Sequence, residues 1–313
     1  MKSREFWRRP GSSIRDGECC KKDFLAHGKR VSVKTILTST NKEVVIAEGR
    51  PTVLIGERIN PTGRKNIKAA LQEGNYELIC REALDQVQSG ADILDVNVGV
   101  AGLNEEVLLP EVMQFVMDTI DIPLCIDSAS PRALEAALKR YKGKALVNSV
   151  TAEDKSLEEI LPLVKTYGAA VVGLTIDNGG IPKDGTGRLK LARKIVEWGE
   201  AMGIPRADII IDCVAQSIGA DSQAGTVVLE AIRTIRAELG VNLTLGASNL
   251  SFGLPDRHLL NNAFLAMVIA AGVNCPIVDV SKARTAVLSS DLILGCDPHA
   301  VRYVRAYKSR RQD

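Results

Sequence analysis

The sequence predicts a (β/α)8 TIM barrel, and three observations carry the prediction. Short apolar runs recur from Thr52 onward, as expected for parallel strands that are covered on both faces. Segments with apolar residues at helical spacing separate these runs. Eight strand–helix units in about 250 residues match the usual size of such a barrel. The expected strands cover residues 53–56, 93–98, 123–126, 145–147, 170–175, 209–211, 243–246 and 276–278.

The helices between the strands follow from apolar spacing and from start signals. Ile79, Ala83 and Val87 recur at helical spacing, and similar patterns predict helices over 109–120 and 228–239. Ser130–Pro131 predicts a helix start, with a capping side chain followed by proline in the first helical position. Ser156 and Glu159 have the spacing of a capping box, which predicts another start.

An open, doubly wound sheet is the main structural alternative to the barrel. Such a sheet normally has fewer strands, and for a nucleotide it needs a glycine-rich first turn. Neither GxGxxG nor GxxxxGK[ST] occurs in the chain. The sequence therefore favours the barrel and disfavours dinucleotide or P-loop binding.

Composition excludes several classes of function. The 313 residues include 40 Lys+Arg and 38 Asp+Glu, and aromatic residues make up 4%. This balance argues against nucleic-acid binding. No apolar run approaches the roughly 20 residues of a membrane helix. The seven cysteines form no CxxC motif, so we expect reduced thiols in a cytoplasmic protein.

Three regions are expected along the chain. Residues 1–30 hold nine Lys/Arg against four Asp/Glu and are interpreted as a basic N-terminal extension, either a solvated arm or a partner-docking arm. Residues 31–50 are expected to form a β-hairpin that caps the barrel, with strands at 31–37 and 43–47. Residues 51–313 are expected to form the barrel itself.

Polar residues follow the predicted strands, at the end of a barrel where active sites lie. They are carboxylates, carboxamides and serines, namely Glu57, Asn60, Asp95, Asn97, Asp127, Ser128, Asn148, Ser149, Asp177, Asn178, Asp212, Ser248, Asn249 and Asp279. Histidine, lysine and cysteine are absent from this set. A histidine-ligated metal, a Ser-His-Asp triad and a Schiff-base lysine are therefore poorly supported.

These acceptors suit a flat heterocycle with several N–H donors, such as a 2-amino-4-oxopyrimidine edge. Other interpretations stay open at this point. Asp95 has a structural alternative, in which it accepts backbone N–H groups at the barrel mouth. Asp177–Gly180 has the composition of a simple turn. A carboxylate cluster is also able to hold Mg²⁺ through oxygen ligands.

Seven segments in order make the sequence more specific. They read IGERINPTGRK (55–65), GADILDVNVG (90–99), LCIDSA (124–129), LVNS (146–149), GLTIDNGGIPKD (173–184), IIIDC (209–213) and LGASNLSFGLPDR (245–257). Together they resemble the pterin-binding TIM barrels, and in particular the methyltetrahydrofolate:corrinoid methyltransferases. The folate module of cobalamin-dependent methionine synthase is a further relative. The likeness covers about residues 33–308.

The resemblance implies roles for individual residues. Asp127, Asn148 and Asp212 match residues that bind the pterin ring, and Asn249 matches the residue at N5, which carries the methyl group. The remaining matches concern the surroundings of the folate. Gly246 and Ser248 line the ring, Arg257 lies near the outer folate, and Glu57, Asn60, Asp95 and Asn97 support the pocket.

The implied reaction moves a methyl group between N5 of 5-methyltetrahydrofolate and the cobalt of a corrinoid carried by a partner protein, in either direction. Tetrahydrofolate and 5-methyltetrahydrofolate are then substrates, cobalamin or a related corrinoid belongs to the partner, and no metal is bound directly. Asn249 is the expected catalytic residue, with Asp212 and solvent completing its hydrogen-bond network, since the pocket offers no group near N5 with a pKa suited to acid catalysis. Members of the family are commonly homodimers.

Dihydropteroate synthase is the first alternative, because it shares the fold. Its sequence pattern differs from this chain at three places. It has a different segment after the second strand, a lysine-containing segment near the ligand, and a terminal Ser–x–His–Arg. The corresponding segments here read LDVNVG and VDVSKAR, and no lysine ends the sixth or seventh strand. A non-catalytic pterin- or folate-binding module is the second alternative.

Overall fold

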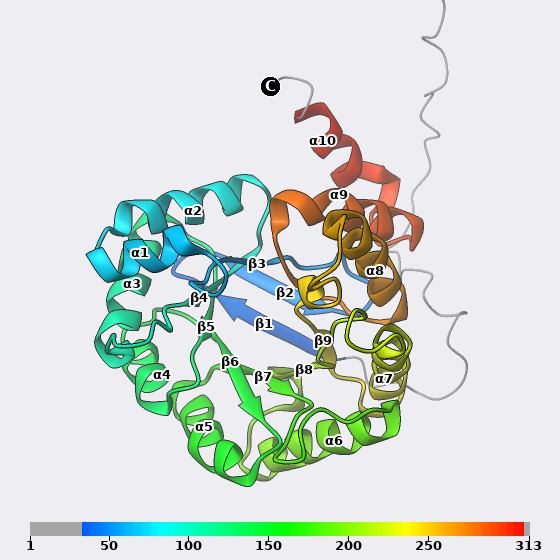
Figure 1. The fold of residues 1–313 in the computed structure, drawn as a ribbon, viewed down its shortest axis with the longest axis horizontal. Helices are drawn as coiled ribbons and strands as arrows, with labels where there is room; N and C mark the ends of the chain where they lie inside the picture. The colour runs from blue at the N-terminus through cyan, green and yellow to red at the C-terminus, as the bar shows by residue number, and fades with distance from the viewer. Residues whose placement is uncertain (1–32, 310–313) are drawn as a thin grey trace, which may run out of the picture.

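Eight parallel strands form one sheet in the structure, a computed structural model that describes residues 33–309. The strand order is β10-β3-β4-β5-β6-β7-β8-β9. A parallel bridge between Gly246 and Ile277 joins the two outer strands, so the sheet closes into the predicted (β/α)8 barrel (Figure 1). The strands are β3 (Ile55–Ile59), β4 (Ile93–Asn97), β5 (Leu124–Asp127), β6 (Leu146–Thr151), β7 (Ala170–Leu174), β8 (Ile209–Asp212), β9 (Asn242–Thr244) and β10 (Ile277–Val278).

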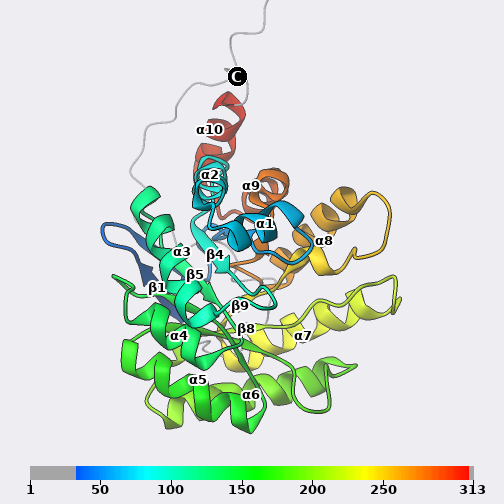
Figure 2. The ribbon, with the colours of Figure 1, turned by 60° about the vertical axis from the view of Figure 1, so that its left-hand side comes forward.

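Helices surround the barrel, and the last of them projects beyond it (Figures 1 and 2). The described helices are α1 (Lys65–Glu73), α2 (Tyr76–Gln88), α3 (Glu105–Thr119), α4 (Pro131–Leu138), α5 (Asp154–Tyr167), α6 (Gly185–Ala201), α7 (Ala224–Leu239), α8 (Arg257–Ala271), α9 (Val280–Ile293) and α10 (Val301–Ser309). Three short 3-10 turns, η1 (Arg206–Asp208), η2 (Ala247–Asn249) and η3 (Pro298–Ala300), lie in the connections.

One predicted helix start is confirmed and another is wrong. The Ser130 hydroxyl accepts from the N–H of Ala133 at 3.3 Å, and Pro131 opens α4. The capping box at Ser156 does not form, because α5 already begins at Asp154. The Ser156 hydroxyl instead accepts from the backbone N–H of Thr151 at the end of β6, at 3.0 Å.

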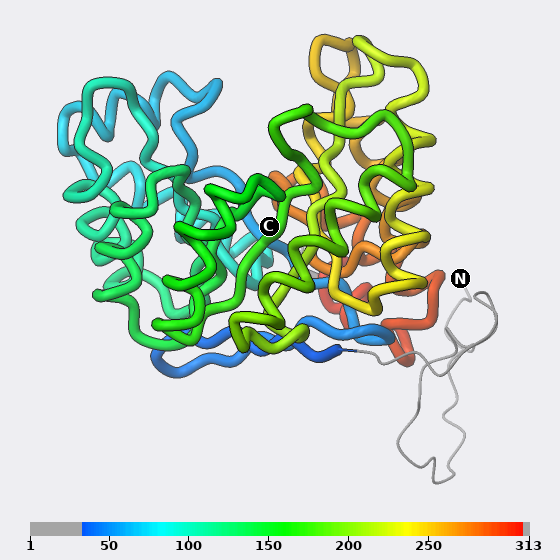
Figure 3. Tube along the Cα trace, turned by 90° about the horizontal axis from the view of Figure 1, so that it is seen from below, coloured from blue at the N-terminus to red at the C-terminus, as the bar shows by residue number. Residues whose placement is uncertain are grey.

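An antiparallel hairpin covers the amino-terminal end of the barrel (Figure 3). It consists of β1 (Lys34–Thr38) and β2 (Glu43–Ala47). Leu37 and Ile46 are buried in one apolar cluster with residues from the starts of the strands, among them Ile93 and Leu146. The hairpin therefore fills the floor of the barrel interior. The extension predicted for residues 1–30 lies outside the described residues.

Polar contacts fix the hairpin to the strands above it. The side-chain amide of Asn242, buried at the start of β9, donates to the hydroxyl of Thr35 at 2.8 Å and to the carbonyl of Ile46 at 2.9 Å. At the other end of the hairpin, Thr38 and Lys144 exchange two backbone hydrogen bonds of 3.1 Å each. The hydroxyl of Tyr141 also donates to the carbonyl of Thr38, at 2.9 Å.

Gly143 allows this close approach, and we expect Gly143→Ala to destabilise the protein. Its φ is +126°, and an added Cβ would lie 2.3 Å from the carbonyl oxygen of Thr38. We expect the free energy of unfolding to fall by about 2 kcal/mol or more in urea titrations. The matched control is Gly168→Ala, where φ is +62° and no atom lies within 4 Å of the added Cβ. Equal losses in the two variants would show that the contact with the hairpin does not matter.

Candidate active site

Four of the predicted site residues meet at the carboxyl ends of β4, β5 and β6. Asn97, Asp127 and Asn148 stand at the same level of these three neighbouring strands. Asp95 lies one pleat deeper on β4, and its carboxylate accepts from the side-chain amide of Asn148 at 3.1 Å. The side-chain amide of Asn97 hydrogen-bonds Asp127. Alternation along each strand brings these side chains to the barrel mouth together.

Asp95 and Asp127 form a carboxyl pair in which Asp95 is buried and Asp127 is half-buried. Burial, followed by the charge of Asp127, raises the pKa of Asp95 well above its ordinary value. Burial also raises the pKa of Asp127, to about 6, while hydrogen bonds from Asn97 and Asp95 oppose the shift. Asp95 is therefore the carboxyl of the pair that binds a proton more readily. Near neutral pH, Asp127 remains an ionised acceptor with a lone pair available to a ligand.

Asp212 ends β8 on the other side of the mouth. One of its carboxylate oxygens accepts from the backbone N–H of Val214 at 2.6 Å. Burial raises the pKa of Asp212 to about 7, and the N–H of Val214 and the charge of Arg188 oppose that rise. A carboxyl group with such a pKa exchanges protons near neutrality. The sequence did not predict proton exchange by Asp212 near neutrality, because the ordinary pKa of an aspartate is near 4.

Arg188 is the buried cation beside Asp212. This α6 residue is 1% exposed. Its guanidinium donates to the carbonyls of Cys213 at 2.6 Å and Val214 at 2.9 Å, which hold the loop after β8. The sequence did not indicate this role, because an arginine within an amphipathic helix normally occupies an exposed position.

The elevated pKa of Asp212 predicts a pH-dependent stability. The folded protein keeps a proton on this carboxyl up to about pH 7, whereas the unfolded chain releases it near pH 4. Stability is therefore lost as pH rises from about 4 to 7. We expect Asp212→Asn to remove this contribution, so that its free energy of unfolding increases relative to wild type across that range. Urea titrations of the ligand-free proteins from pH 5 to 8 measure the difference, and a constant difference would contradict the prediction.

Asn249 lies at the open edge of the site, on η2 after β9. Its side chain is exposed. An added Cβ on Gly246 would lie 3.0 Å from the amide nitrogen of Asn249. Glycine at 246 therefore leaves room for the amide to lie over the end of β9.

Beside Asn249 is a cavity of about 700 Å³, between the ends of β3, β9 and β10 and the starts of α8 and α9. It contains six of the residues predicted for the site, Glu57, Asn60, Ser248, Asn249, Arg257 and Asp279. The acceptors on β4, β5, β6 and β8 do not line it. The predicted site thus has two parts, an acceptor cup and a side cavity, and the charge of Glu57 is close enough to raise the pKa of Asp95.

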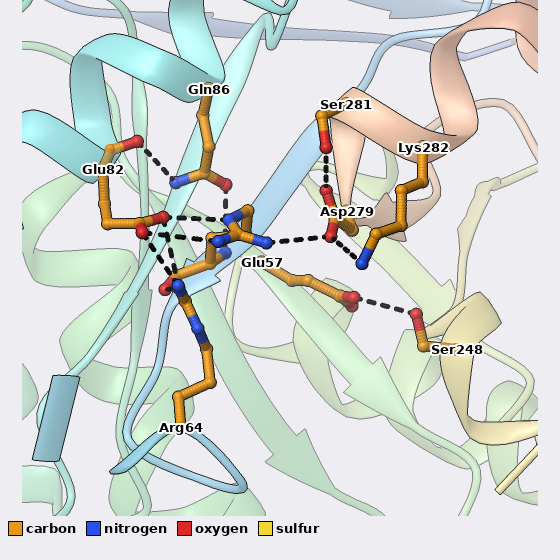
Figure 4. A network of polar contacts seen from close by, with 9 residues as sticks. Glu57, Arg64, Glu82, Gln86, Ser248, Asp279, Ser281 and Lys282 are labelled. Carbon is orange, nitrogen blue, oxygen red and sulfur yellow. Dashed lines mark hydrogen bonds and ion pairs between the residues drawn. The ribbon is translucent and has the colours of Figure 1, made fainter. Parts of the chain in front are cut away.

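Glu57 points into the cavity and accepts from the hydroxyl of Ser248 at 2.8 Å (Figure 4). Burial raises its pKa, and this effect is larger than the opposing hydrogen bond from Ser248. Asn60, in contrast, caps the loop after β3, where its side-chain oxygen accepts from the N–H of Thr62 at 2.8 Å. Arg257 donates to the carbonyl of Ser248 at 2.9 Å.

A network of ion pairs builds the wall of the cavity (Figure 4). The carboxylate of Glu82 on α2 forms ion pairs with Arg58 at 2.9 Å and with Arg64 at 2.8 Å. Arg58 also contacts Asp279 at 3.0 Å, and Lys282 contacts the same carboxylate at 3.0 Å. Burial opposes ionisation of Asp279, but its hydrogen bonds from Ser281 and Lys282 and the charge of Arg58 outweigh burial and lower its pKa.

Several residues of this wall were not predicted from sequence. Arg58, Arg64 and Lys282 line the cavity together with Asn261. Arg58 and Arg64 belong to the IGERINPTGRK segment, which was the available signal. Asp177, by contrast, accepts from the N–H of Gly179 at 2.8 Å in an exposed turn, as its composition indicated.

Between residues 33 and 309, no group of three or more His, Cys, Asp or Glu side chains is arranged to hold a metal ion. Over the same part of the chain, no helix has the length and apolar character needed to cross a membrane.

A sequence profile described as pterin binding enzyme matches residues 56–279. The chain belongs to the pterin-binding enzymes. The match begins in β3 and ends at Asp279, so it includes both the acceptor cup and much of the cavity wall of this pterin-binding enzyme.

Two relatives illustrate the likeness within the family. A protein of Eubacterium limosum named methylcorrinoid:tetrahydrofolate methyltransferase is 30% identical over 263 residues, which covers 82% of this pterin-binding enzyme and 96% of the relative. The methionine synthase of Mycobacterium tuberculosis (strain ATCC 25618 / H37Rv) is 29% identical over 271 residues. That match covers 81% of this chain but 22% of the larger protein.

Solved structures of dihydropteroate synthases share the fold. The enzyme from Stenotrophomonas maltophilia has a TM-score of 0.64 at 16% identity, over 83% of this chain and 98% of that one. The enzyme from Thermus thermophilus in complex with 6HMPPP has a TM-score of 0.62 at 20% identity, over 82% of this chain and 99% of that one. At these identities the likeness establishes the common barrel alone.

Proposed function

We propose that this protein transfers a methyl group between N5 of 5-methyltetrahydrofolate and the cobalt of a corrinoid on a partner protein. The observation that carries the proposal is an acceptor cup beside an exposed amide at an open barrel mouth, in a chain 30% identical to a methylcorrinoid:tetrahydrofolate methyltransferase across 96% of that relative. Dihydropteroate synthase activity has no comparable support, since those enzymes match at 16–21% identity.

The pterin ring lies in the cup in this proposal. Its amino and ring N–H groups donate to Asp127 and Asp212. Asn148 hydrogen-bonds the ring while its side-chain amide also donates to Asp95 at 3.1 Å. Asp95 and Asn97 support Asp127, while Gly246 and Ser248 line the ring on the side of the cavity. Buried carboxylates need such donors, because an unpaired buried acceptor is costly.

The protein's contribution to catalysis is made at N5. When the C–N bond breaks, its electron pair remains on N5, which takes up a proton as the methyl group leaves. Asn249 donates a hydrogen bond that strengthens as charge develops on N5. Asp212, with a pKa of about 7, connects that atom to solvent protons. A corrinoid on the partner supplies the Co(I) nucleophile or, in the reverse direction, the methyl group.

The proposal extends to the assembly and its location. A homodimer in the cytoplasm is the expected form, with a separate corrinoid protein as the macromolecular partner. Light scattering of the purified protein tests the dimer, since a monomer at micromolar concentration would contradict it.

A spectroscopic assay tests the reaction. The protein is mixed anaerobically with 5-methyltetrahydrofolate and Co(I) cobalamin, and formation of methylcobalamin is followed in the visible spectrum. We expect enzyme-dependent formation, and the reverse reaction from methylcobalamin and tetrahydrofolate. Absence of transfer in both directions would reject the proposal. Incubation with a dihydropterin pyrophosphate and p-aminobenzoate serves as the comparison, with no pteroate expected.

A further inference from the structure

Arg188 joins two loops at the mouth of the barrel. One terminal nitrogen of its guanidinium donates to the carbonyls of Cys213 and Val214, in the loop after β8. The other terminal nitrogen donates to the side-chain oxygen of Gln216 in the same loop, at 3.2 Å. Its Nε donates to the carbonyl of Pro182 at 3.1 Å, in the loop between β7 and α6. One side chain thus connects the loops that follow two neighbouring strands.

The guanidinium is buried among neutral acceptors. Arg188 is 1% exposed, and each of the four hydrogen bonds above ends on a carbonyl or amide oxygen. Burial lowers its pKa, while Cys213, Asp212 and Asp184 oppose that change. Cys213 is a neutral thiol, because burial raises its pKa. Asp184 is exposed at the start of α6, where solvent screens its charge. Asp212 is therefore the buried counter-charge of the arginine.

A single peptide group lies between Arg188 and the carboxylate of Asp212. It is the peptide that links Cys213 to Val214. Its oxygen accepts from the guanidinium at 2.6 Å, and its N–H donates to the carboxylate at 2.6 Å. The φ of Val214 is +52°, which is rare for a β-branched residue and persists only where surrounding contacts hold it. A cation at the oxygen of this peptide polarises it, which strengthens the hydrogen bond from its N–H.

We propose that Arg188 is a positioning residue for the methyl transfer, which acts through this peptide group to keep Asp212 an ionised acceptor directed at the pterin. The inference rests on the proposed function, which places the pterin at Asp212. One carboxylate oxygen is held by the N–H of Val214, so the other is available to the N–H groups of the pterin. The buried positive charge favours the ionised form of the carboxyl.

The neighbours of Asp212 on the adjoining strands are neutral. The hydroxyl of Thr175, after β7, donates to the backbone carbonyl of Asp212 at 3.1 Å. On β9, Thr244 pairs with Asp212 in the sheet, but its hydroxyl donates to the carbonyl of Cys275 at 2.7 Å. Cys275 is a neutral thiol, because burial raises its pKa. Burial also raises the pKa of Asp212, and the charged side chain that opposes this rise is Arg188.

The pH dependence of folate binding tests the inference. Isothermal titration with 5-methyltetrahydrofolate from pH 6 to 9 is expected to show that wild-type affinity falls below about pH 7, where Asp212 takes up a proton. In Arg188→Gln, which removes the charge but keeps an amide donor, we expect this midpoint to rise by about one pH unit, with most of the affinity regained at pH 9. Arg188→Lys keeps the charge, so we expect its midpoint to stay near that of wild type.

Arg193→Gln is the matched control on the same helix. Its side chain is 45% exposed and forms an ion pair with Glu238, and we expect the wild-type midpoint. A purely structural role of Arg188 would lower affinity by the same factor at every pH. That result in Arg188→Gln, or equal shifts in Arg188→Gln and Arg188→Lys, would overturn the inference, and methyl transfer to Co(I) cobalamin by wild type would leave the proposed function standing. No folate binding and no transfer by wild type would reject both.

Urea titrations without ligand provide a second measurement. In wild type, stability is lost with rising pH until Asp212 is ionised near pH 7. In Arg188→Gln we expect the loss to continue to about pH 8. In an Asp212→Asn background, we expect the cost of Arg188→Gln to be the same at pH 7 and pH 8. An equal pH dependence with and without Asp212 would show that the arginine does not act on this carboxyl.

Discussion

Asn249→Ala is expected to lower the rate of methyl transfer about 10²-fold or more, with a much smaller effect on folate affinity. The amide is exposed at the mouth, so in the ground state its hydrogen bond to N5 replaces one to water and contributes little to binding. As the C–N bond breaks, charge grows on N5 and the same bond strengthens. Stopped-flow single-turnover rates with saturating folate, together with a binding titration, separate the two effects.

Two further variants sharpen this test. Asn249→Asp keeps the shape of the side chain but removes the N–H donor when ionised, so we expect a loss similar to that of Asn249→Ala. Asn75→Ala changes an exposed asparagine before α2 and should leave the rate unchanged. Equal losses of rate and affinity in Asn249→Ala would remove its proposed role in the transition state.

Asp127→Ala and Asp212→Ala are each expected to weaken folate binding about 10- to 100-fold. Each replacement removes an ionised acceptor from the pterin edge, and hydrogen bonds to charged groups are worth about 1.5–3 kcal/mol. Asp127→Ala also removes the carboxylate that interacts with Asp95. Isothermal titration with 5-methyltetrahydrofolate near pH 7.5 measures the loss.

Asp118→Ala provides the control for these two variants. Asp118 is an exposed carboxylate on α3 that accepts from Gln114 at 2.8 Å, and its removal should not change affinity. Asp127→Asn and Asp212→Asn keep the volume and one acceptor oxygen, so we expect smaller losses than in the alanine variants. Wild-type affinity in both alanine variants would place the pterin elsewhere.

The acceptor cup was predictable because local patterns determine it. Apolar runs reveal parallel strands, and parallel strands in a closed barrel present their carboxyl ends at one mouth. The polar residue that ends each run therefore belongs to that mouth. Asn97, Asp127 and Asn148 follow this rule, and the observed pairing places them side by side.

The cavity wall was less predictable because it depends on contacts between distant segments. Glu82 lies within an amphipathic helix, and its sequence context does not indicate that it joins Arg58 and Arg64. Asn261 occupies α8, where only the assembled cavity reveals an unsatisfied oxygen. Asn242 is a similar case, since its function of holding Thr35 and Ile46 arises from a hairpin about 200 residues earlier.

The hairpin under the barrel has a kinetic consequence for a methyltransferase. Leu37 and Ile46 are packed into the floor of the barrel, so folate enters and leaves through the barrel mouth. The corrinoid protein must dock at the same mouth. Folate binding, docking of the corrinoid protein and folate release therefore use the same opening and must occur one after another. A partner that lingers after the transfer would trap the spent folate, so a large excess of that partner should slow turnover instead of accelerating it.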